Sequence, residues 1–398
     1  MLCKLKVAIV GCGKIADDHV QAIRRIPDCE IIAVCDREPL MASQLGERFG
    51  ISACFSDLEE LLQSTFPDVV HITTPPQSHF ALGMLCVKHG CHVYVEKPFA
   101  VDAVQAERLI ESAERHGRKV TVGNDVQFTH AAMHFRTLVE EGFLGGEPVH
   151  MESFYCYEFS TSYAAALLGD RKHWVRHLPG KLLQNIISHG IVRVAEYLQD
   201  KDPLVIAHGC TSPLLRHFGE DEILDELRVM IATKSGPTAY FTFSSQMRPS
   251  LHQFRLYGPA NGLVLDDDEH SVIKLHGKRY KSYAQKFIPS IKGAAQQLAN
   301  LKRNIKLFAK QDFHMKAGLK NLIEAFYRSI REDGPLPIPY RQILLTCKIM
   351  DEIFAQTNGK DEQQHNRSRS SNGDRQEIIA DQIVTHEKRE VVNVDVGR

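Results

Sequence analysis

Three small residues with a fixed spacing near the start of the chain form the first group that could do chemistry. Gly11, Gly13 and Ala16 follow a short apolar run and fit the G-x-G-x-x-A pattern of dinucleotide-binding turns. Gly11 allows a tight turn, Gly13 lets a pyrophosphate approach bare backbone, and Ala16 lets the next helix lie close to the strand. The amides at the helix start, including those of Lys14 and Ile15, then face the phosphates. The alternative interpretation is a tight strand–helix turn without a ligand.

A carboxylate follows the second apolar run, Glu30–Cys35. Asp36 comes about 20 residues beyond the glycines, where its side chain can accept hydrogen bonds from the adenosine ribose hydroxyls. Because a carboxylate repels a 2′-phosphate, the sequence favours NAD over NADP. Arg37 leaves NADP open, since a guanidinium can pair with that phosphate. The alternative for Asp36 is a helix N-cap, and the two roles are compatible.

Two more polar loops follow predicted strands. The strand 68–72 leads into the run 73–76 and then to His79, and the strand 91–95 leads into Glu96-Lys97-Pro98. The carboxyl ends of parallel strands share one edge of a sheet, where the ligands of such folds collect. The alternative for Lys97 is a surface lysine after a strand. We expect the following residues of these loops at the cofactor site: Thr74, Pro75, His79, Glu96 and Lys97.

Strands and helices alternate over the whole first part of the chain. Helices are predicted over 56–62, 80–89 and 103–116, and a further strand over 119–122. This alternation predicts a doubly wound parallel sheet with helices on both faces, an α/β Rossmann domain over residues 1–126.

Length and composition limit the class of protein. The chain has 398 residues, 43% of them hydrophobic, and a net charge of -1, which suffices for two domains with full cores. A near-zero charge argues against nucleic acid as a partner. The ten cysteines form no C-x-x-C pair, so we predict reduced thiols and no metal site. Without an apolar stretch long enough to span a bilayer or room for a signal peptide before the first strand, we expect a cytoplasmic protein.

Together the motifs resemble the Gfo/Idh/MocA family of oxidoreductases. The resemblance rests on VAIVGCGKIA, the acid at Asp36, TTPPQSH, GCHVYVEKPFA and a later histidine segment, and the E-K-P run is its most specific part. It covers residues 1 to about 357, densely over the first domain and loosely after it. In that family the lysine of E-K-P lies beside the nicotinamide and the substrate hydroxyl. The resemblance therefore implies a catalytic and substrate-binding role for Lys97, whose ammonium would stabilise a developing alkoxide.

A second domain is predicted over residues 127–357. A helix over 128–141 precedes a β-rich region, whose hairpin-length connections predict an α+β domain with a largely antiparallel open sheet. The resemblance implies that paired subunits cover such a sheet, so a homo-oligomer, a dimer or tetramer, is expected. The candidate strands are 150–157, 204–210, 227–233, 238–244, 252–257 and 262–266.

One helix of this domain is predicted to run from Gly180 through Leu198, with Asn185 and His189 on one face. The family usually carries an aspartate and a histidine at this spacing, which point into the cleft opposite the nicotinamide. The resemblance makes His189 the candidate general base, since imidazole titrates near neutrality. Asn185 departs from the pattern: an amide can orient a substrate hydroxyl but carries no proton. A structural histidine is the alternative for His189.

Trp174 is the only tryptophan and precedes this helix. It could stack on a sugar ring in the cleft, and core packing is the alternative.

Residues 290–310 combine two features of a surface helix. Apolar residues recur at three-and-four spacing, and lysines and Arg303 make the remaining surface basic. The favoured interpretation is an amphipathic helix that packs on its own domain or on a sister subunit. The alternative is a helix that lies on a membrane surface or against a lipid-linked substrate. The apolar positions are Ile291, Ala294, Ala295, Leu298, Leu301, Ile305 and Phe308.

The chain ends with two predicted helices, 318–330 and 343–354, which in the family pack back on the first domain. The polar composition of residues 358–398 predicts disorder.

The predicted function is hydride transfer between NAD(P) and a secondary alcohol of a sugar, a sugar derivative or a cyclic polyol. Two alternatives stay open. One is a redox-neutral glycosidase, epimerase or lyase that uses transient oxidation by NAD. The other is a cofactor-sensing regulator without catalysis, an interpretation to which Asn185 lends weight.

Overall fold

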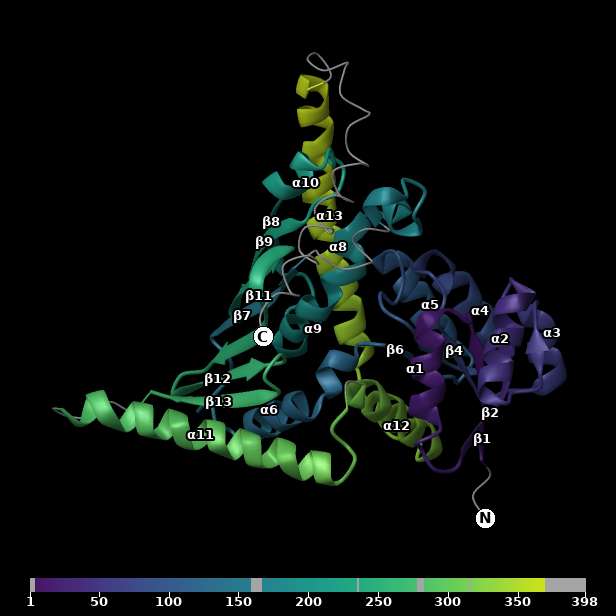
Figure 1. Ribbon diagram of the computed structural model, residues 1–398, viewed down its shortest axis with the longest axis horizontal. Coiled ribbons are helices and arrows are strands. Elements are labelled where there is room, and N and C mark those ends of the chain that lie inside the picture. The colour runs from purple at the N-terminus through teal and green to yellow at the C-terminus, as the bar shows by residue number, and fades with distance from the viewer. Residues whose placement is uncertain (1–3, 159–166, 235, 278–282, 315, 369–398) are drawn as a thin grey trace, which may run out of the picture.

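The computed structural model describes residues 4–158, 167–234, 236–277, 283–314 and 316–368, those from 358 onward in backbone only. Two sheets dominate the molecule, and the long helix α13 (Tyr340–Ser368) runs between them, as Figure 1 shows. This helix contacts α5 (Ala103–Arg115) of the first sheet's layer and both α9 (Ser188–Tyr197) and β8 (Leu204–Cys210) of the second.

The first sheet has the strand order β3-β2-β1-β4-β5-β6, and every pair in it is parallel. Its central strand has no polar face: Val7, Ala8 and Ile9 are all fully buried, as expected for a strand covered by helices on both sides. The predicted Rossmann fold is confirmed. The strands are β1 (Leu5–Val10), β2 (Cys29–Cys35), β3 (Cys54–Phe55), β4 (Val69–Ile72), β5 (His92–Val95) and β6 (Val120–Val122), and the helices that follow them, besides α5, are α1 (Lys14–Ile23), α2 (Pro39–Phe49), α3 (Leu58–Thr65) and α4 (His79–Lys88).

A helix from the far end of the chain completes this first core. α12 (Ala317–Arg331) packs on α1, and its Leu322, Phe326 and Tyr327 are fully buried in the same cluster as Val7 and Ile9. The resemblance implied this packing of the C-terminal helices on the first domain.

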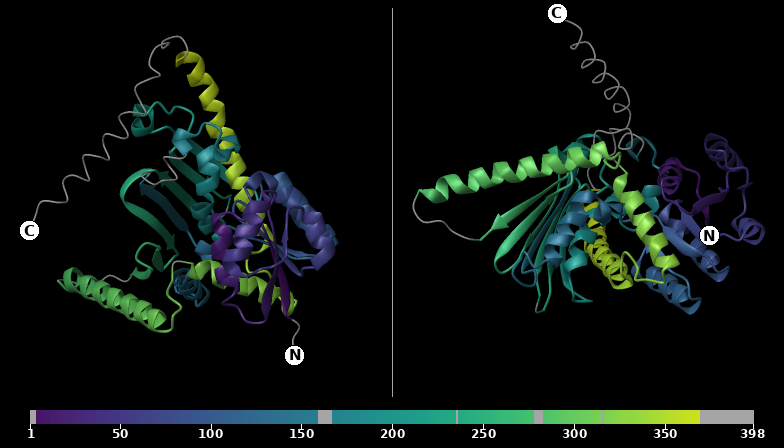
Figure 2. Two further views of the ribbon diagram at one scale, coloured as in Figure 1. Left: turned by 45° about the vertical axis from the view of Figure 1, so that its right-hand side comes forward. Right: turned by 90° about the horizontal axis from the view of Figure 1, so that it is seen from below.

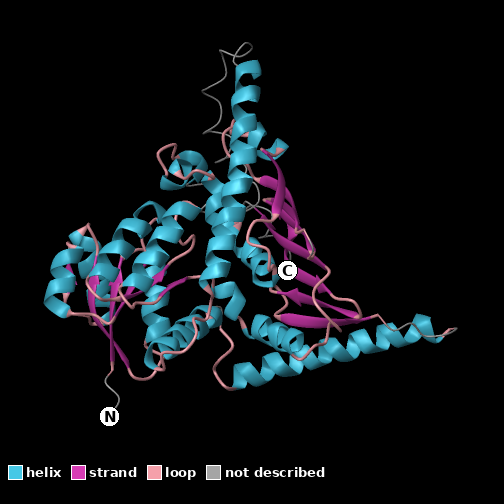
Figure 3. Ribbon diagram, turned by 180° about the vertical axis from the view of Figure 1, so that it is seen from behind, coloured by secondary structure: helices cyan, strands magenta, loops and turns pink. Residues whose placement is uncertain are grey.

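The second sheet of the described residues has seven strands in the order β13-β12-β11-β7-β10-β9-β8. All neighbours are antiparallel except β7 and β10, so the largely antiparallel sheet is confirmed. The described helices α6 (His130–Glu140), α9 and α13 pack on this sheet, which Figure 3 shows from behind. The strands besides β8 are β7 (His150–Glu158), β9 (Glu226–Ala232), β10 (Thr238–Ser244), β11 (Gln246–Tyr257), β12 (Asn261–Asp266) and β13 (Ser271–His276), and α6 lies on the same covered face as α9.

Several elements differ from the sequence prediction, and α2 (Pro39–Phe49) and β3 (Cys54–Phe55) were not predicted. The strand β13 was not predicted. The single helix over 180–198 is two helices, α8 (Lys181–Ile186) and α9, because the Ile187 carbonyl accepts a hydrogen bond from Gly190 N, three residues on, at 3.0 Å. Apolar periodicity continues through such a local irregularity and does not reveal it.

The helix α13 extends to Ser368, which contradicts the predicted disorder over residues 358–368. Glutamine, glutamate and lysine are good helix formers, and no proline ends the helix there. The remainder of the predicted polar tail, 369–398, lies outside the described residues. Among the described helices none is long and apolar enough to cross a bilayer.

Candidate active site

The glycine turn joins β1 to α1 and leaves its ligand side open. Gly11 has φ +96°, and a Cβ there would lie 2.8 Å from the Thr73 carbonyl carbon and 2.9 Å from Thr74 N, so only glycine fits. A Cβ on Gly13 would meet no atom within 4 Å. Gly13 is the N-cap of α1, and no side chain caps the helix. The turn therefore offers free helix amides beside open space, which is the arrangement a pyrophosphate requires.

Asp36 lies at the end of β2 beside this turn. Its Oδ2 accepts a hydrogen bond from Cys12 N at 2.7 Å, and its Oδ1 accepts one from Glu38 N at 3.0 Å. Glu38, not Asp36, is the N-cap of α2, so the N-cap alternative for Asp36 is wrong. The Arg37 side chain is 92% exposed, with its Nε 3.9 Å from Glu38 Oε1. The carboxylate is held in place by the glycine turn, with lone pairs left for ribose hydroxyls.

The loop after β4 contains the short helix η1 (Pro76–Ser78). Thr74 is half-buried and its hydroxyl accepts a hydrogen bond from Ser78 Oγ at 2.7 Å, while Pro75 is exposed. His79, a predicted cofactor residue, lies inside the protein. It is fully buried, with Nδ1 2.9 Å from the Pro98 carbonyl oxygen and Nε2 2.8 Å from that of Thr74. Its ring joins the loops after β4 and β5, and in its neutral form it donates to one of these two carbonyls.

A buried chain of hydrogen bonds holds Glu96 from behind. Glu96 Oε1 lies 2.8 Å from His19 Nε2, and His19 Nδ1 lies 2.9 Å from His71 Nδ1. His71 Nε2 lies 2.8 Å from the Tyr327 hydroxyl of α12. One assignment satisfies every atom with both rings neutral: Tyr327 donates to His71, His71 donates to His19, and His19 donates to Glu96.

The charge of Glu96 agrees with this assignment. Burial raises the pKa of Glu96, but the His19 hydrogen bond and nearby positive charge outweigh burial, and the net shift is downward. Burial lowers the pKa of His71 well below its usual value. Glu96 is thus an anchored carboxylate directly before Lys97, whose backbone N donates to Glu96 Oε2 at 3.3 Å.

Lys97 connects the two halves of the molecule. Its Nζ donates a hydrogen bond to the backbone carbonyl of Asn185 at 2.9 Å. Asn185 lies in α8, one helical turn before His189 at the start of α9. Burial lowers the pKa of Lys97, and Glu96 and Asp125 oppose that shift. This hydrogen bond brings an ammonium of the first domain to the helix turn that precedes His189.

His189 is neutral in this environment. Burial, followed by the charge of Lys97, lowers its pKa well below 6.5, so the expectation of titration near neutrality is wrong. The imidazole stacks on Tyr155 of β7, with ring centroids 5.1 Å apart. Its Nδ1 is buried and contacts no described donor or acceptor. A neutral ring with an unpartnered buried nitrogen can accept a proton or a hydrogen bond from a ligand.

Asp125 and Lys316 join these groups from distant parts of the chain. Asp125 starts the short helix η2 (Asp125–Phe128) directly after β6, and burial, with a further contribution from Glu96, raises its pKa to about 6. Lys316 precedes α12; its Nζ lies 3.0 Å from Asp18 Oδ2, and its charge lowers the pKa values of Lys97 and His189. Sequence reasoning missed both residues. The position of Asp125 after a parallel strand was an available signal, whereas Lys316 gave none.

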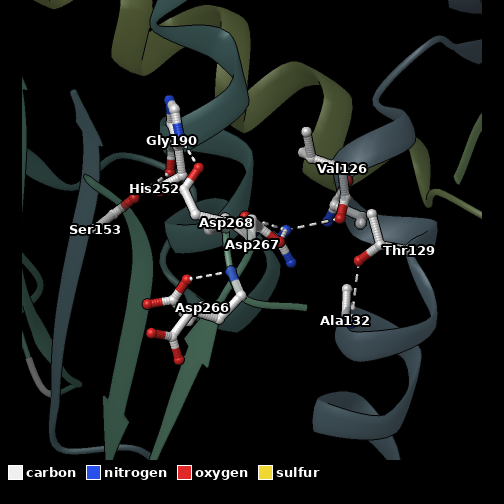
Figure 4. Close-up of polar contacts among 12 residues, drawn as sticks. Val126, Thr129, Ala132, Ser153, Gly190, His252, Asp266, Asp267 and Asp268 are labelled. Atoms are coloured by element: carbon white, nitrogen blue, oxygen red, sulfur yellow. Dashed lines mark hydrogen bonds and ion pairs between the residues drawn. The ribbon is translucent and has the colours of Figure 1, made fainter. Parts of the chain in front are cut away.

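The second sheet supports His189 from the other side. His252 of β11 packs on Tyr155 at 4.5 Å between ring centroids, and its Nδ1 lies 2.7 Å from Asp268 Oδ1. Figure 4 shows His252 and Asp268 together at the turn that follows β12. This pair also escaped the sequence analysis, because only the pairing of β11 with β12 brings the two residues together.

A buried ion pair fixes the turn that carries these acids. Arg193, four residues beyond His189, donates to both carboxylate oxygens of Asp267 at 2.8 and 2.9 Å and to the Val126 carbonyl at 2.7 Å. Val126 and Asp267 face each other across this contact in Figure 4. The ion pair ties α9 to η2, and so holds the His189 segment against the first domain.

Trp174 lies at the edge of the same region, in the short helix η3 (Trp174–His177). Its carbonyl accepts a hydrogen bond from Gln77 Nε2 of the loop after β4 at 3.1 Å. Its ring is half-buried, stacks on His173 at 5.7 Å and packs on the second core. The described residues contain no group of three or more His, Cys, Asp or Glu arranged to hold a metal ion.

The parallel sheet, the open glycine turn and the carboxylate after β2 define an NAD-binding Rossmann domain of the oxidoreductase class. Residues 5–124 match the model of the oxidoreductase family with an NAD-binding Rossmann fold. Residues 5–124 thus match the NAD-binding domain of the Gfo/Idh/MocA family. The predicted family and the predicted nicotinamide dinucleotide cofactor are confirmed.

Two relatives have named activities. The chain is 32% identical over 142 residues to D-glucoside 3-dehydrogenase of Escherichia coli, a match that covers 35% of this chain and 40% of that protein. It is 26% identical over 240 residues to inositol 2-dehydrogenase/D-chiro-inositol 3-dehydrogenase of Lactiplantibacillus plantarum, covering 58% and 62% of the two chains. The matches thus span less than two thirds of either relative.

A solved structure shares the fold over almost the whole chain. The WlbA dehydrogenase from Bordetella pertussis, in complex with NADH and UDP-GlcNAcA, superposes with a TM-score of 0.71 at 15% identity. The match covers 90% of this chain and 97% of that one.

Proposed function

We propose that the protein is an NAD(P)-dependent dehydrogenase that acts on a secondary alcohol of a sugar, a sugar derivative or a cyclic polyol. The observation that carries this proposal is the 2.9 Å hydrogen bond from Lys97 Nζ to the Asn185 carbonyl. It brings an ammonium of the first domain to the helix turn before a neutral, partly unpartnered imidazole, that of His189. The names of the glucoside and inositol dehydrogenases support the substrate class.

The glycine turn and Asp36 fit a dinucleotide. Gly13 leaves open space, the amides of Lys14 and Ile15 lie at an uncapped helix start, and Asp36 presents a fixed carboxylate for the ribose. When bound, the nicotinamide supplies the hydride acceptor or donor. We assign NAD as the preferred form, because Arg37 points to solvent beside Glu38 and not toward Asp36.

The protein's own groups handle the hydroxyl proton. Lys97 donates a hydrogen bond to the substrate oxygen and stabilises the negative charge that develops on it. His189 accepts the hydroxyl proton, since its neutral form prevails near neutral pH. Asn185 orients a substrate hydroxyl, and Trp174 lines the sugar side of the site.

The test is turnover of a panel of sugars, sugar acids and cyclic polyols with NAD and NADP, followed by the absorbance of the reduced cofactor. Lys97→Met and His189→Gln should each lower kcat/KM by about 10²–10⁴-fold. Both variants should bind NADH within a few-fold of the unsubstituted protein, because neither side chain belongs to the glycine turn. Lys88→Met, an exposed lysine on α4, is the matched control and should leave turnover unchanged.

Two results would overturn the proposal. One is full turnover by Lys97→Met, and the other is NADH binding without any turned-over alcohol in the panel, which would favour the regulator. Product formed without net reduced cofactor would favour the redox-neutral reaction. The comparisons favour neither alternative, because the named relatives are dehydrogenases.

The same proposal includes the cellular setting. We assign the protein to the cytoplasm, in keeping with the free thiols of its described cysteines. We also assign a homo-oligomer, since Leu204, Ile206 and Tyr240 are each about half or more exposed on the strands of the second sheet. Sedimentation velocity of the full chain tests the second assignment.

A further inference from the structure

The long helix α11 (Ala284–Ala309) is attached to the protein by polar side chains. Gln296 accepts a hydrogen bond from Lys274 N of β13 at 2.7 Å and donates one to Lys274 O at 3.2 Å. Asn300 is buried and does the same to Val272, at 3.4 and 3.1 Å. The two amides thus pair with the backbone edge of β13 as a neighbouring strand would, and they cover that edge.

The apolar residues of α11 consequently face away from the protein. Six large side chains share the outer face and are each more than half exposed. The sequence pattern favoured packing on the chain's own domain or on a sister subunit, and packing on its own domain is wrong for this face. The exposed fractions are 63% for Phe287, 67% for Ile291, 66% for Leu298, 55% for Leu301, 57% for Ile305 and 71% for Phe308.

The helix stands at the periphery of the molecule. Figure 1 and the view from below in Figure 2 show α11 running along the edge of the second sheet and projecting beyond it. Its 26 residues correspond to about 39 Å of straight helix. The outer apolar face is therefore a long stripe along a peripheral helix.

The charge of α11 is entirely positive. The helix contains five cations and no aspartate or glutamate, in a chain whose net charge is -1. At 3.6 residues per turn, Lys302 and Lys306 fall beside the apolar stripe. The cations are Lys286, Lys292, Lys302, Arg303 and Lys306, and Lys310 follows at the C-cap.

We propose that α11 docks on an anionic lipid surface, with the apolar stripe in the boundary between headgroups and acyl chains and the cations at the phosphates. A long exposed apolar stripe flanked by lysines is the pattern of helices that lie in the membrane interface. A second copy of the chain fits this helix poorly. Two α11 helices packed face to face would bring like charges together, and neither helix has a carboxylate to compensate them.

Flotation of the full chain with lipid vesicles tests the proposal. Vesicles of phosphatidylcholine with phosphatidylglycerol should carry the protein, and vesicles of phosphatidylcholine alone should carry much less of it. Leu298→Gln with Ile305→Gln should lower the bound fraction on anionic vesicles about tenfold or more, because both side chains lose apolar contact with lipid. Lys302→Glu with Lys306→Glu should lower it by at least a similar factor.

The matched control is Leu40→Gln on α2, a leucine that is 68% exposed but lies away from α11. It should bind vesicles like the unsubstituted chain. None of these substitutions removes a buried side chain, so the melting temperature and NADH binding should stay unchanged in all of them. Loss of vesicle binding with an unchanged melting temperature separates docking from misfolding.

Three results would overturn the proposal. The first is no flotation of the unsubstituted protein with anionic vesicles. The second is flotation that the Leu298 and Ile305 substitutions leave unchanged. The third is self-association in solution that the same substitutions abolish while vesicles bind nothing, which would make α11 a subunit interface. Failure of vesicle binding leaves the dehydrogenase proposal untouched, because that proposal rests on Lys97 and His189.

Discussion

Replacing each glycine of the turn by alanine separates folding from cofactor binding. At Gly11 the new Cβ would lie 2.8–2.9 Å from backbone atoms of Thr73 and Thr74. The backbone of Thr73 is held in place by two hydrogen bonds, so it cannot move away from the new Cβ. Thr73 N donates to Val10 O at 2.8 Å, and Thr73 Oγ1 donates to Gly11 O at 2.6 Å. Overpacking costs about 1–3 kcal/mol and φ +96° adds about 1–2 kcal/mol, so we expect Gly11→Ala to lose about 2–5 kcal/mol.

At Gly13 the same substitution should behave in the opposite way. Its φ of −75° suits any residue, and its Cβ would meet no atom within 4 Å. Alanine there should leave the free energy of unfolding unchanged or raise it by about 0.4–1 kcal/mol, because the unfolded chain loses freedom. The methyl group occupies the space in which a pyrophosphate would approach, and NADH should bind about 10–100-fold more weakly, a loss of about 1.4–2.8 kcal/mol.

Urea unfolding measures the free energy of unfolding of each variant, and NADH titration measures its affinity for the cofactor. If Gly13→Ala bound NADH as tightly as the unsubstituted protein, the open space would not be the dinucleotide site. If Gly11→Ala were as stable as the unsubstituted protein, the close approach of Thr73 and Thr74 would be wrong.

Four further predictions concern the site and the groups buried around it. The pKa of His189 is lower in the folded protein than the usual value of 6.5, so the unfolded chain takes up the proton first as the pH falls. The stability that neutral His189 contributes is therefore complete above about pH 6.5 and is lost as the pH falls toward the folded-state pKa. In urea unfolding across that range, the free energy of unfolding of His189→Gln should depend less steeply on pH. Lys97→Met should raise the pKa of His189 in an NMR titration, since it removes the charge that lowers this pKa most. An unchanged pKa would show that Lys97 and His189 do not interact. Asp36→Ser should shift the ratio of NAD to NADP affinity toward NADP by about tenfold or more, measured by cofactor titration. Tyr327→Phe should cost about 1–3 kcal/mol in urea unfolding, because His71 Nε2 loses its donor in a fully buried position, and a neutral result would contradict the assigned direction of that chain.

Most elements of the first domain could be predicted, apart from α2 and β3, and the reason is local. Gly11, Gly13 and Asp36 act through short-range rules of turn geometry and strand ends, which the sequence displays directly. The place of His79 in the chain suggested a ligand contact, but the sequence did not show that its ring nitrogens would lie 2.8 and 2.9 Å from the carbonyl oxygens of Thr74 and Pro98. Whether a ligand or the backbone binds these ring nitrogens depends in part on where Pro98, 19 residues further along the chain, is placed.

Less of the second domain could be predicted, because contacts between residues far apart in the sequence assemble its part of the site. His252 reaches the His189 region only through the pairing of β11, and Lys316 only through the packing of α12. The pKa of His189 could not be anticipated either, since burial and the charge of Lys97 arise from the other domain. For residues 290–310, periodicity identified the helix and its apolar face correctly. It could not tell which face the protein would use, because Gln296 and Asn300 compete for a strand edge that the sequence did not reveal.

Because α12 completes the first core, this core cannot form fully until late in the synthesis of the chain. The residues Leu322, Phe326 and Tyr327 belong to the same cluster as Val7 and Ile9. About 200 residues separate Val122 from Ala317, which a ribosome translates in roughly 10–40 s at about 5–20 residues per second. During that interval the emerging β-α units lack their last covering helix. The cofactor-binding half, although synthesised first, therefore completes its core only when most of the chain has been translated.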